Sequence, residues 1–118
     1  MKGDHTLFLA IEKTVQDNMF LHHGMYVIKD VDLAEILEVN IRELRRNIRN
    51  NMERFPSDFI TELNVGEYAF AEPGIIMLGG LLQSERAIKV HLQFIEYFVH
   101  VAHENGTSVF DLINSGKE

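Results

Sequence analysis

Residues 40–58 have the sequence NIRELRRNIRNNMERFPSD, which places five arginines within thirteen residues of a chain whose formal net charge is −7. Residues 40–55 hold those five arginines and two glutamates, a local charge of +3, so the remainder of the chain carries −10. A basic stretch on an acidic protein is the electrostatic footprint of a surface that binds a polyanion. Nucleic acid is therefore the first candidate partner.

This stretch predicts a helix with a defined start and end. Asn40, followed by a glutamate three residues later, has the spacing of a capping box and predicts a helix that begins at Ile41. We expect this helix to run to about Phe55, because Pro56 disfavours helical geometry at the residue before it. A short predicted helix over residues 33–38 lies just upstream, and two helices joined by such a turn form a helix-turn-helix candidate.

The predicted helix over 41–55 divides into distinct faces when its residues are placed at 100° each. One face is an apolar stripe that we expect to be buried: Ile41, Leu44, Ile48, Met52 and Phe55. The adjacent arc is basic: Arg42, Arg45, Arg46 and Arg49. The remaining surface is polar: Asn47, Asn50, Asn51 and Arg54. Guanidinium groups suit phosphates and the edge of guanine, and asparagine suits adenine.

The ordinary alternative for such an arc is a solvated helix face. Arg42 with Arg46, and Arg45 with Arg49, are like-charge pairs four residues apart, which destabilise an isolated helix. Only Glu53 is placed to relieve them, whereas a helix that serves solubility alone would alternate its charges. We therefore predict DNA contact through Arg42, Arg45, Arg46, Arg49, Asn47, Asn50 and Arg54.

Upstream of the basic stretch the sequence predicts mixed structure. Leu7–Val15 has apolar spacing that fits either a short helix or a strand. His22-His23 precedes Gly24 and predicts a loop, and Met25–Ile28 is β-branched and aromatic, which predicts a strand. Asp32, with a glutamate three residues later, caps the short helix over 33–38.

Downstream of the basic stretch we expect a hairpin and then helices. Residues 59–63 and 68–70 are its predicted strands, joined by a turn over 64–66. A helix begins near Pro73 and runs through Leu82. The longest helix covers residues 85–104, capped by Ser84 and ended by Asn105-Gly106, and Thr107 or Ser108 caps a last short turn. The predicted fold class is α+β: a helix-turn-helix-like pair, a small antiparallel sheet and a long C-terminal helix.

The long predicted helix over 85–104 carries two apolar stripes. One consists of Ile88, Leu92, Ile95, Val99 and Ala102. The other consists of Ala87, Val90, Phe94, Phe98 and Val101. Both stripes fit inside a small domain, or one faces a second copy of the chain. We favour a homodimer through this helix, because a second stripe on a near-terminal helix needs a partner.

The composition sets broad limits. With 118 residues and 46% apolar content, residues 1–118 are expected to form one globular domain with its own core. The chain has no cysteine, which excludes disulfides and thiolate zinc sites. The start of the chain resembles a secretory signal poorly, and the longest apolar run, Ile75–Leu82, is eight residues against the roughly 20 that span a bilayer. We expect a cytoplasmic protein, in a bacterium or a phage-infected host, without membrane contact.

Three blocks occur in order along the chain: DVDLAEILEV (30–39), NNMERFPSDFITEL (50–63) and YAFAEPGIIMLGGLLQSERAIKVHLQFIEYFV (68–99). Together they resemble the KilA-N type of phage DNA-binding domain, and most closely its phage Orf-six N-terminal subfamily, whose relatives include Bro-N and antirepressor proteins. The resemblance covers about residues 24–101. It implies an α+β fold and sequence-specific DNA binding in phages, prophages and large DNA viruses.

The family motifs map onto this chain position by position. Residues 30–35 stand where the family has its D-x-DLAE block, and residues 51–59 match its N-x-x-RFP-x-DF run. Arg42 and Arg49 occupy basic positions of the intervening helix. Glu72 and Gly74 match a T-E-x-G turn, and residues 84–88 (SERAI) match directly.

Some positions depart from the family pattern. The usual glycine between the two helices is Glu38, so the turn is open to a different construction. An Asn-Gln pair of the family is Arg45-Arg46, and a Lys-Arg pair is Arg49-Asn50. If these positions read bases, the DNA target differs from that of the relatives.

Other chemistry is weakly indicated. His100 and His103, with Glu96 and Glu104 nearby, would form a metal-ligand face, but the polar face of a helix accounts for them better. No phosphate-binding glycine loop, nucleophile elbow or paired-carboxylate motif is present, so we expect no enzyme activity and no cofactor. The first functional hypothesis is a transcriptional or lysogeny regulator that binds duplex DNA. The second is an antirepressor-type module whose arginines dock on an acidic protein partner, such as a repressor or another regulator.

Overall fold

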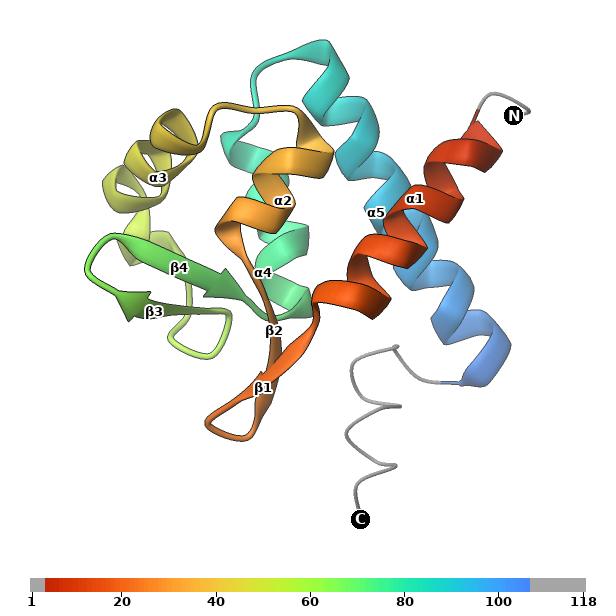
Figure 1. The fold of residues 1–118 in the computed structure, drawn as a ribbon, viewed down its shortest axis with the longest axis horizontal. Coiled ribbons are helices and arrows are strands. Elements are labelled where there is room, and N and C mark those ends of the chain that lie inside the picture. The colour runs from red at the N-terminus through yellow and green to blue at the C-terminus, as the bar shows by residue number, and fades with distance from the viewer. Residues whose placement is uncertain (1–3, 107–118) are drawn as a thin grey trace.

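The structure, a computed structural model, describes residues 4–106, which form a group of helices with a small sheet at one edge (Figure 1). In chain order the elements are α1 (Asp4–Asn18), β1 (Phe20–His22), β2 (Met25–Lys29), α2 (Asp30–Leu37), α3 (Ile41–Asn50), the 3₁₀ turn η1 (Met52–Arg54), β3 (Ile60–Asn64), β4 (Glu67–Phe70), α4 (Glu72–Met77), the 3₁₀ turn η2 (Leu78–Leu81) and α5 (Glu85–Asn105). The predicted α+β class, with a helix pair, an antiparallel sheet and a long last helix, is confirmed. The last short turn predicted after Thr107 lies outside the described residues.

The sheet is antiparallel, with the strand order β1-β2-β4-β3. Phe70 pairs with Ile28 on one side and with Ile60 on the other, so β4 joins the two hairpins. The prediction of a loop at His22-His23 was partly wrong, because His22 belongs to β1 and pairs with Met25. His23 and Gly24 form the turn, with φ of 49° and 84°. Positive φ at both central residues is the geometry that matches the twist of a two-residue hairpin.

Helix α2 lies at the centre of the molecule (Figure 1). It contacts α1, α3 and α5, and also the strands β2 and β4. Its buried side chains Leu33 and Leu37 join a core that includes Phe70, Ile75 and Phe94. Since α3 packs on α2, the position of α3 is set by the same core that holds the sheet.

Helix α2 begins two residues before the predicted cap at Asp32. Its N-cap residue is Lys29, which makes no side-chain capping bond, and Asp30 and Asp32 both lie in the first turn. Asp30 is almost fully buried, with 1% of its surface exposed. The capping-box prediction was therefore wrong at this helix, because α2 begins at Asp30 and Asp32 lies inside its first turn rather than before it.

Several other boundaries also differ from the prediction. The α-helix of the basic stretch ends at Asn50 rather than near Phe55, and η1 continues it as 3₁₀ turns. Helix α4 likewise ends at Met77 and continues as η2, where the missing side chain of Gly79 leaves room for the ring of His91. The segment at 7–15, left open between helix and strand, is part of α1. For α5, the predicted Ser84 cap is confirmed, since its Oγ accepts a hydrogen bond from the Ala87 N–H at 3.0 Å.

Among the described residues, no helix is both long and apolar enough to cross a membrane.

The turn between α2 and α3 keeps a left-handed residue where the family pattern has glycine. Glu38 is the C-cap of α2, with φ of 59° and ψ of 44°, and its N–H bonds the Glu35 carbonyl at 3.2 Å. Its carboxylate accepts a hydrogen bond from Arg86 Nε at 3.0 Å. The departure at Glu38 therefore preserves the geometry of the turn and costs backbone strain.

We expect Glu38→Gly to be more stable than Glu38→Ala by about 1 kcal/mol, because only glycine adopts this φ without a Cβ penalty. Both variants lose the same exposed ion pair with Arg86, which is worth at most about 1 kcal/mol, so the comparison isolates the backbone term. Urea titration of the two variants measures the difference. Equal stability would mean that Glu38 is not strained at this position.

Candidate nucleic-acid interface

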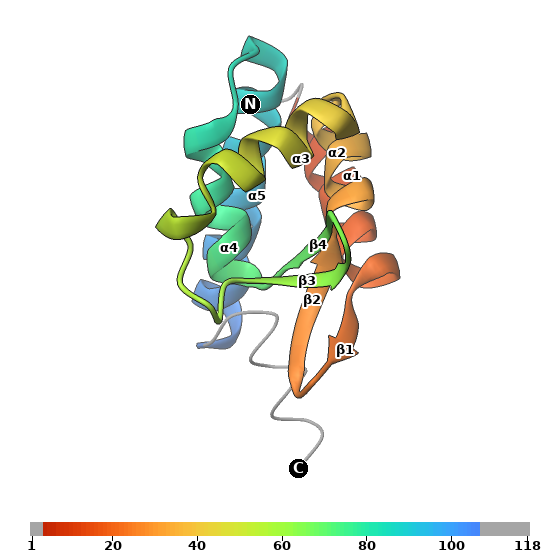
Figure 2. The same ribbon diagram turned by 90° about the vertical axis from the view of Figure 1, so that its left-hand side faces the viewer.

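Helix α3 lies at one edge of the molecule, with its apolar side turned inward (Figures 1 and 2). Leu44 and Ile48 are buried, with 2% and 0% of their surfaces exposed. Ile41 and Met52 are half-buried and pack against the same core, and Phe55 is buried after the helix ends. The apolar stripe predicted for the basic stretch is confirmed. Its burial fixes which face of α3 is presented to solvent.

Asn40 caps the N-terminus of α3, as the sequence predicted. Asn40 Oδ1 accepts hydrogen bonds from the backbone N–H groups of Arg42, at 2.8 Å, and of Glu43, at 3.1 Å. These bonds satisfy two of the amides that a helix N-terminus leaves without partners inside the helix. The arginines that follow are thus carried by a helix with a well-defined first turn.

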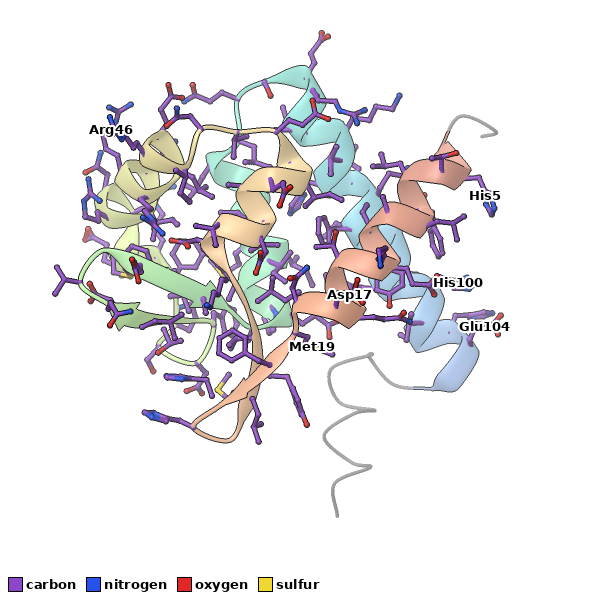
Figure 3. The ribbon with its side chains drawn as sticks, viewed as in Figure 1. His5, Asp17, Met19, Arg46, His100 and Glu104 are labelled. Atoms are coloured by element: carbon purple, nitrogen blue, oxygen red, sulfur yellow. The ribbon has the colours of Figure 1, made fainter. Side chains whose placement is uncertain are left out.

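Arg42, Arg46 and Arg49 are exposed on α3, and we call them the exposed arginine face. Within residues 4–106 none of the three forms an ion pair. Figure 3 shows the side chain of Arg46 extending from α3 away from the body of the molecule. Three guanidinium groups without a carboxylate partner in this part of the chain leave a concentrated positive charge at the edge of an acidic protein.

Arg45 differs from the other three arginines of the predicted arc. Its Nε donates to Asp30 Oδ2 at 2.8 Å, and its Nη2 donates to Asp30 Oδ1 at 3.2 Å. The side chain of Arg45 is 24% exposed and that of Asp30 is 2% exposed. The hydrogen bond from Arg45 to Asp30 raises the pKa of the Arg45 guanidinium above its ordinary value. Because Nε and Nη2 of Arg45 already donate to the Asp30 carboxylate, we leave Arg45 out of the proposed DNA contacts.

Asp30 joins three elements through one carboxylate. Besides its two bonds from Arg45 on α3, its Oδ2 accepts a hydrogen bond from the backbone N–H of Tyr68 on β4 at 3.0 Å. Asp30 itself is the first residue of α2. A bidentate pair with an added backbone donor fixes both distance and orientation. The Asp30 clamp, formed by Asp30, Arg45 and the Tyr68 N–H, therefore holds α3 against α2 and the sheet.

The remaining predicted contacts fall into different environments. Asn50 and Arg54 are exposed, at the end of α3 and on η1. Asn47 is half-buried and lines a groove between α3 and the segment that leads into α5, together with Glu43 and Gln83. Its backbone carbonyl oxygen accepts a hydrogen bond from Asn51 Nδ2 at 2.8 Å. Asn50 and Arg54 are thus presented more openly than Asn47.

The β3–β4 hairpin borders the arginine helix. Burial raises the pKa of the Tyr68 phenol, and Glu62 adds to this shift, whereas Arg49 opposes it, so Arg49 and Tyr68 lie within electrostatic reach of each other. Glu62 is exposed, and its Oε2 accepts a hydrogen bond from the Gly66 N–H at 2.8 Å in the hairpin turn. Val65, at the tip, is 98% exposed. A polyanion on the exposed arginine face would pass close to this hairpin.

The role of Asp30 could not be predicted from the residues close to it in the sequence. Its partners lie 15 and 38 residues away, and no local spacing connects them. The D-x-DLAE block contained the one usable signal, an aspartate that the family resemblance includes and that the capping box left without a role. The histidine face on α5 is not supported as a metal site, since residues 4–106 contain no group of three or more His, Asp or Glu side chains placed to hold an ion.

An α+β fold in which a short helix and a turn position an exposed arginine helix beside a hairpin defines a helix-turn-helix-like class of domain. The chain belongs to the ORF6N domain family, a phage-type family whose model matches residues 17–108. This match extends further in both directions than the resemblance seen over residues 24–101. No match was found among curated proteins or among solved structures.

Proposed function

We propose that this protein is a non-enzymatic DNA-binding module of phage or prophage type that contacts duplex DNA through α3 and acts in transcriptional or lysogeny control. The observation that carries the proposal is the exposed arginine face of Arg42, Arg46 and Arg49, which has no ion-pair partner among residues 4–106. A helix built for solubility would pair these charges with acids of its own. An acidic chain that keeps such a face uncompensated is best explained by an anionic ligand.

The geometry of α3 supports this choice of ligand. In helix-turn-helix domains the second helix of the pair lies in the major groove, while the first helix crosses the DNA backbone. Here α3 is the second helix, lies at the edge of the molecule, and has α2 behind it (Figure 2). We assign Arg42 and Arg46 to phosphates, and Arg49 with Asn50 to base edges, with Arg54 as a further phosphate contact.

A second candidate is an antirepressor-type module that binds an acidic protein through the same face. The acidic remainder of the chain favours it, because a charge of −10 outside the basic stretch repels DNA wherever the two approach. The two candidates differ in their response to salt and to duplex DNA. DNA binding releases condensed counterions from the duplex, which a protein partner does not have.

The test is the affinity for duplex DNA as a function of salt concentration, measured by fluorescence anisotropy with a random-sequence duplex. The three arginines assigned to phosphates, Arg42, Arg46 and Arg54, should give a slope of log affinity against log salt of about −3 per protomer. Arg42→Ala should flatten the slope by about one unit and weaken all duplexes similarly if it contacts a phosphate. The absence of duplex binding at low salt, in a folded protein, would exclude the proposal and favour the protein-partner candidate.

A further inference from the structure

Helix α5 exposes a second apolar face on the side away from the core. One of its stripes is buried in the domain: Ala87, Val90, Phe94 and Phe98. The other, which we call the apolar row, remains at the surface: Ile88, Leu92, Ile95 and Val99. Ile88 is 42% exposed, Leu92 55% and Val99 61%, while Ile95 is half-buried. The fold of one chain therefore uses only one of the two stripes that the sequence encodes.

The spacing of the apolar row is specific to helix pairing. Positions 88, 92, 95, 99 and 102 alternate steps of four and three residues. This is the heptad spacing that keeps a seam facing a partner helix and lets side chains of one helix fit between those of the other. Scattered exposed apolar residues need no explanation, but a continuous row over about three turns of one helix does. We propose that a second copy of this chain covers the apolar row, with α5 packed antiparallel against α5 about a two-fold axis.

The charges beside the row favour the antiparallel orientation. Lys89 follows Ile88 and Glu96 follows Ile95, so the two opposite charges lie on the same side of the row, seven residues apart. When Leu92 packs against Ile95 of the second copy, Lys89 lies beside Glu96 of that copy, and the two-fold axis repeats the contact. In a parallel pair, this side of one helix would instead face the side of the other that carries His91 and Phe98, which are buried in their own domain.

The neighbouring helix α1 enlarges the surface available to the second copy. Phe8 lines a groove with Ile95 and Val99, and His100 and His103 lie along the same groove. Phe8 also packs edge-on against Tyr97, with ring centroids 5.5 Å apart, so its position is fixed by the core. A pair of helices about 30 Å long gives a contact at the low end of specific interfaces, so we expect a dimer that forms at micromolar concentrations.

The inferred dimer leaves the exposed arginine face open. In Figure 2 α3 faces the viewer and α5 lies behind it, with the central part of the domain between them. A second copy seated on α5 would not cover Arg42, Arg46 or Arg49. The inference therefore stands on the apolar row alone and does not depend on the proposed DNA binding.

Sedimentation equilibrium at micromolar concentrations tests the dimer. The wild-type chain should show twice the mass of one chain, and Leu92→Glu/Val99→Glu should weaken the dimer by at least about 100-fold, because it would bury unpaired charges at the seam. The matched control is Val31→Glu/Ile76→Glu, which places the same charges on residues that are both 43% exposed outside α5. It should dimerise like wild type. Monomeric wild type, or equal loss of the dimer in both variants, would overturn the inference.

Cysteine crosslinking tests the orientation, since the chain has no cysteine of its own. In the antiparallel pair, Ile88 of one copy lies near Val99 of the other. A mixture of Ile88→Cys and Val99→Cys chains should therefore form a disulfide-linked dimer, and neither variant should do so alone. Crosslinking of each variant with itself, as a parallel pair requires, would overturn the antiparallel arrangement. As the control for folding, the circular dichroism spectra of both variants should match that of the wild-type chain.

Discussion

Replacing Asp30 with alanine is expected to destabilise the protein by about 3 kcal/mol or more, the range for breaking a buried ion pair from one side. The substitution removes the acceptor of three hydrogen bonds, two from Arg45 and one from the Tyr68 N–H. The Arg45 side chain, 24% exposed, would recover part of its hydration, whereas the Tyr68 N–H would be left without its acceptor inside the protein. Guanidinium chloride titration followed by circular dichroism measures the loss.

The matched control for Asp30 is Asp32, two residues further along α2. Asp32 is the residue that sequence spacing singled out as the helix cap, but it lies in the first turn and is half-buried. Asp32→Ala should change the stability by no more than about 0.5 kcal/mol, because the helix N-terminus favours the charge of this carboxylate, whereas its burial disfavours the charge and raises its pKa. If the two alanine variants lose equal stability, the clamp contributes nothing beyond ordinary helix-end electrostatics, and the special role of Asp30 is wrong.

Features set by neighbouring residues could be predicted from the sequence. The start of α3 at Asn40, the hairpin turn before Glu67 and both ends of α5 each depend on side chains and glycines within a few positions. The periodicity of α3 correctly separated buried from exposed positions, because a helix that packs on one side has only one apolar stripe. These local signals were sufficient to place Arg42, Arg46 and Arg49 on the exposed side of α3, although they placed Arg45 there as well.

The sequence did not reveal which arginines of α3 would be exposed and which would bond to another residue of the protein. Arg45 and Arg46 are adjacent in the sequence and share one arc of the helix, yet one is held by Asp30 and the other extends into solvent. What separates them is the position of α2 and β4, which depends on the packing of the whole core. The change from α-helix to 3₁₀ turn at η1 and η2 was missed for a similar reason, since propensities do not distinguish the two near a helix end. The three-residue strand β1 gave too short a pattern to recognise.

The difference between Arg45, which is bound to Asp30, and the exposed Arg46 and Arg49 decides which variant should test the proposed DNA contact. Arg45→Glu would place a second carboxylate against the buried Asp30, so any loss of binding would be confused with loss of the fold. Arg46 and Arg49 are exposed and carry no ion pair within residues 4–106, so reversing their charges should leave stability nearly unchanged. Arg46→Glu/Arg49→Glu is therefore the informative variant.

We expect Arg46→Glu/Arg49→Glu to weaken binding to duplex DNA at least about 100-fold at low salt, because one phosphate contact and one base contact are lost and two repulsive charges are added. The matched control is Lys13→Glu/Arg86→Glu, which changes the net charge equally at exposed positions on α1 and α5. The control should lose only a few-fold, through the general increase in negative charge. Fluorescence anisotropy with one duplex, on variants whose thermal unfolding matches wild type, measures both. If the two variants bind DNA equally well, the affinity reflects net charge alone, and α3 is not the surface that contacts DNA.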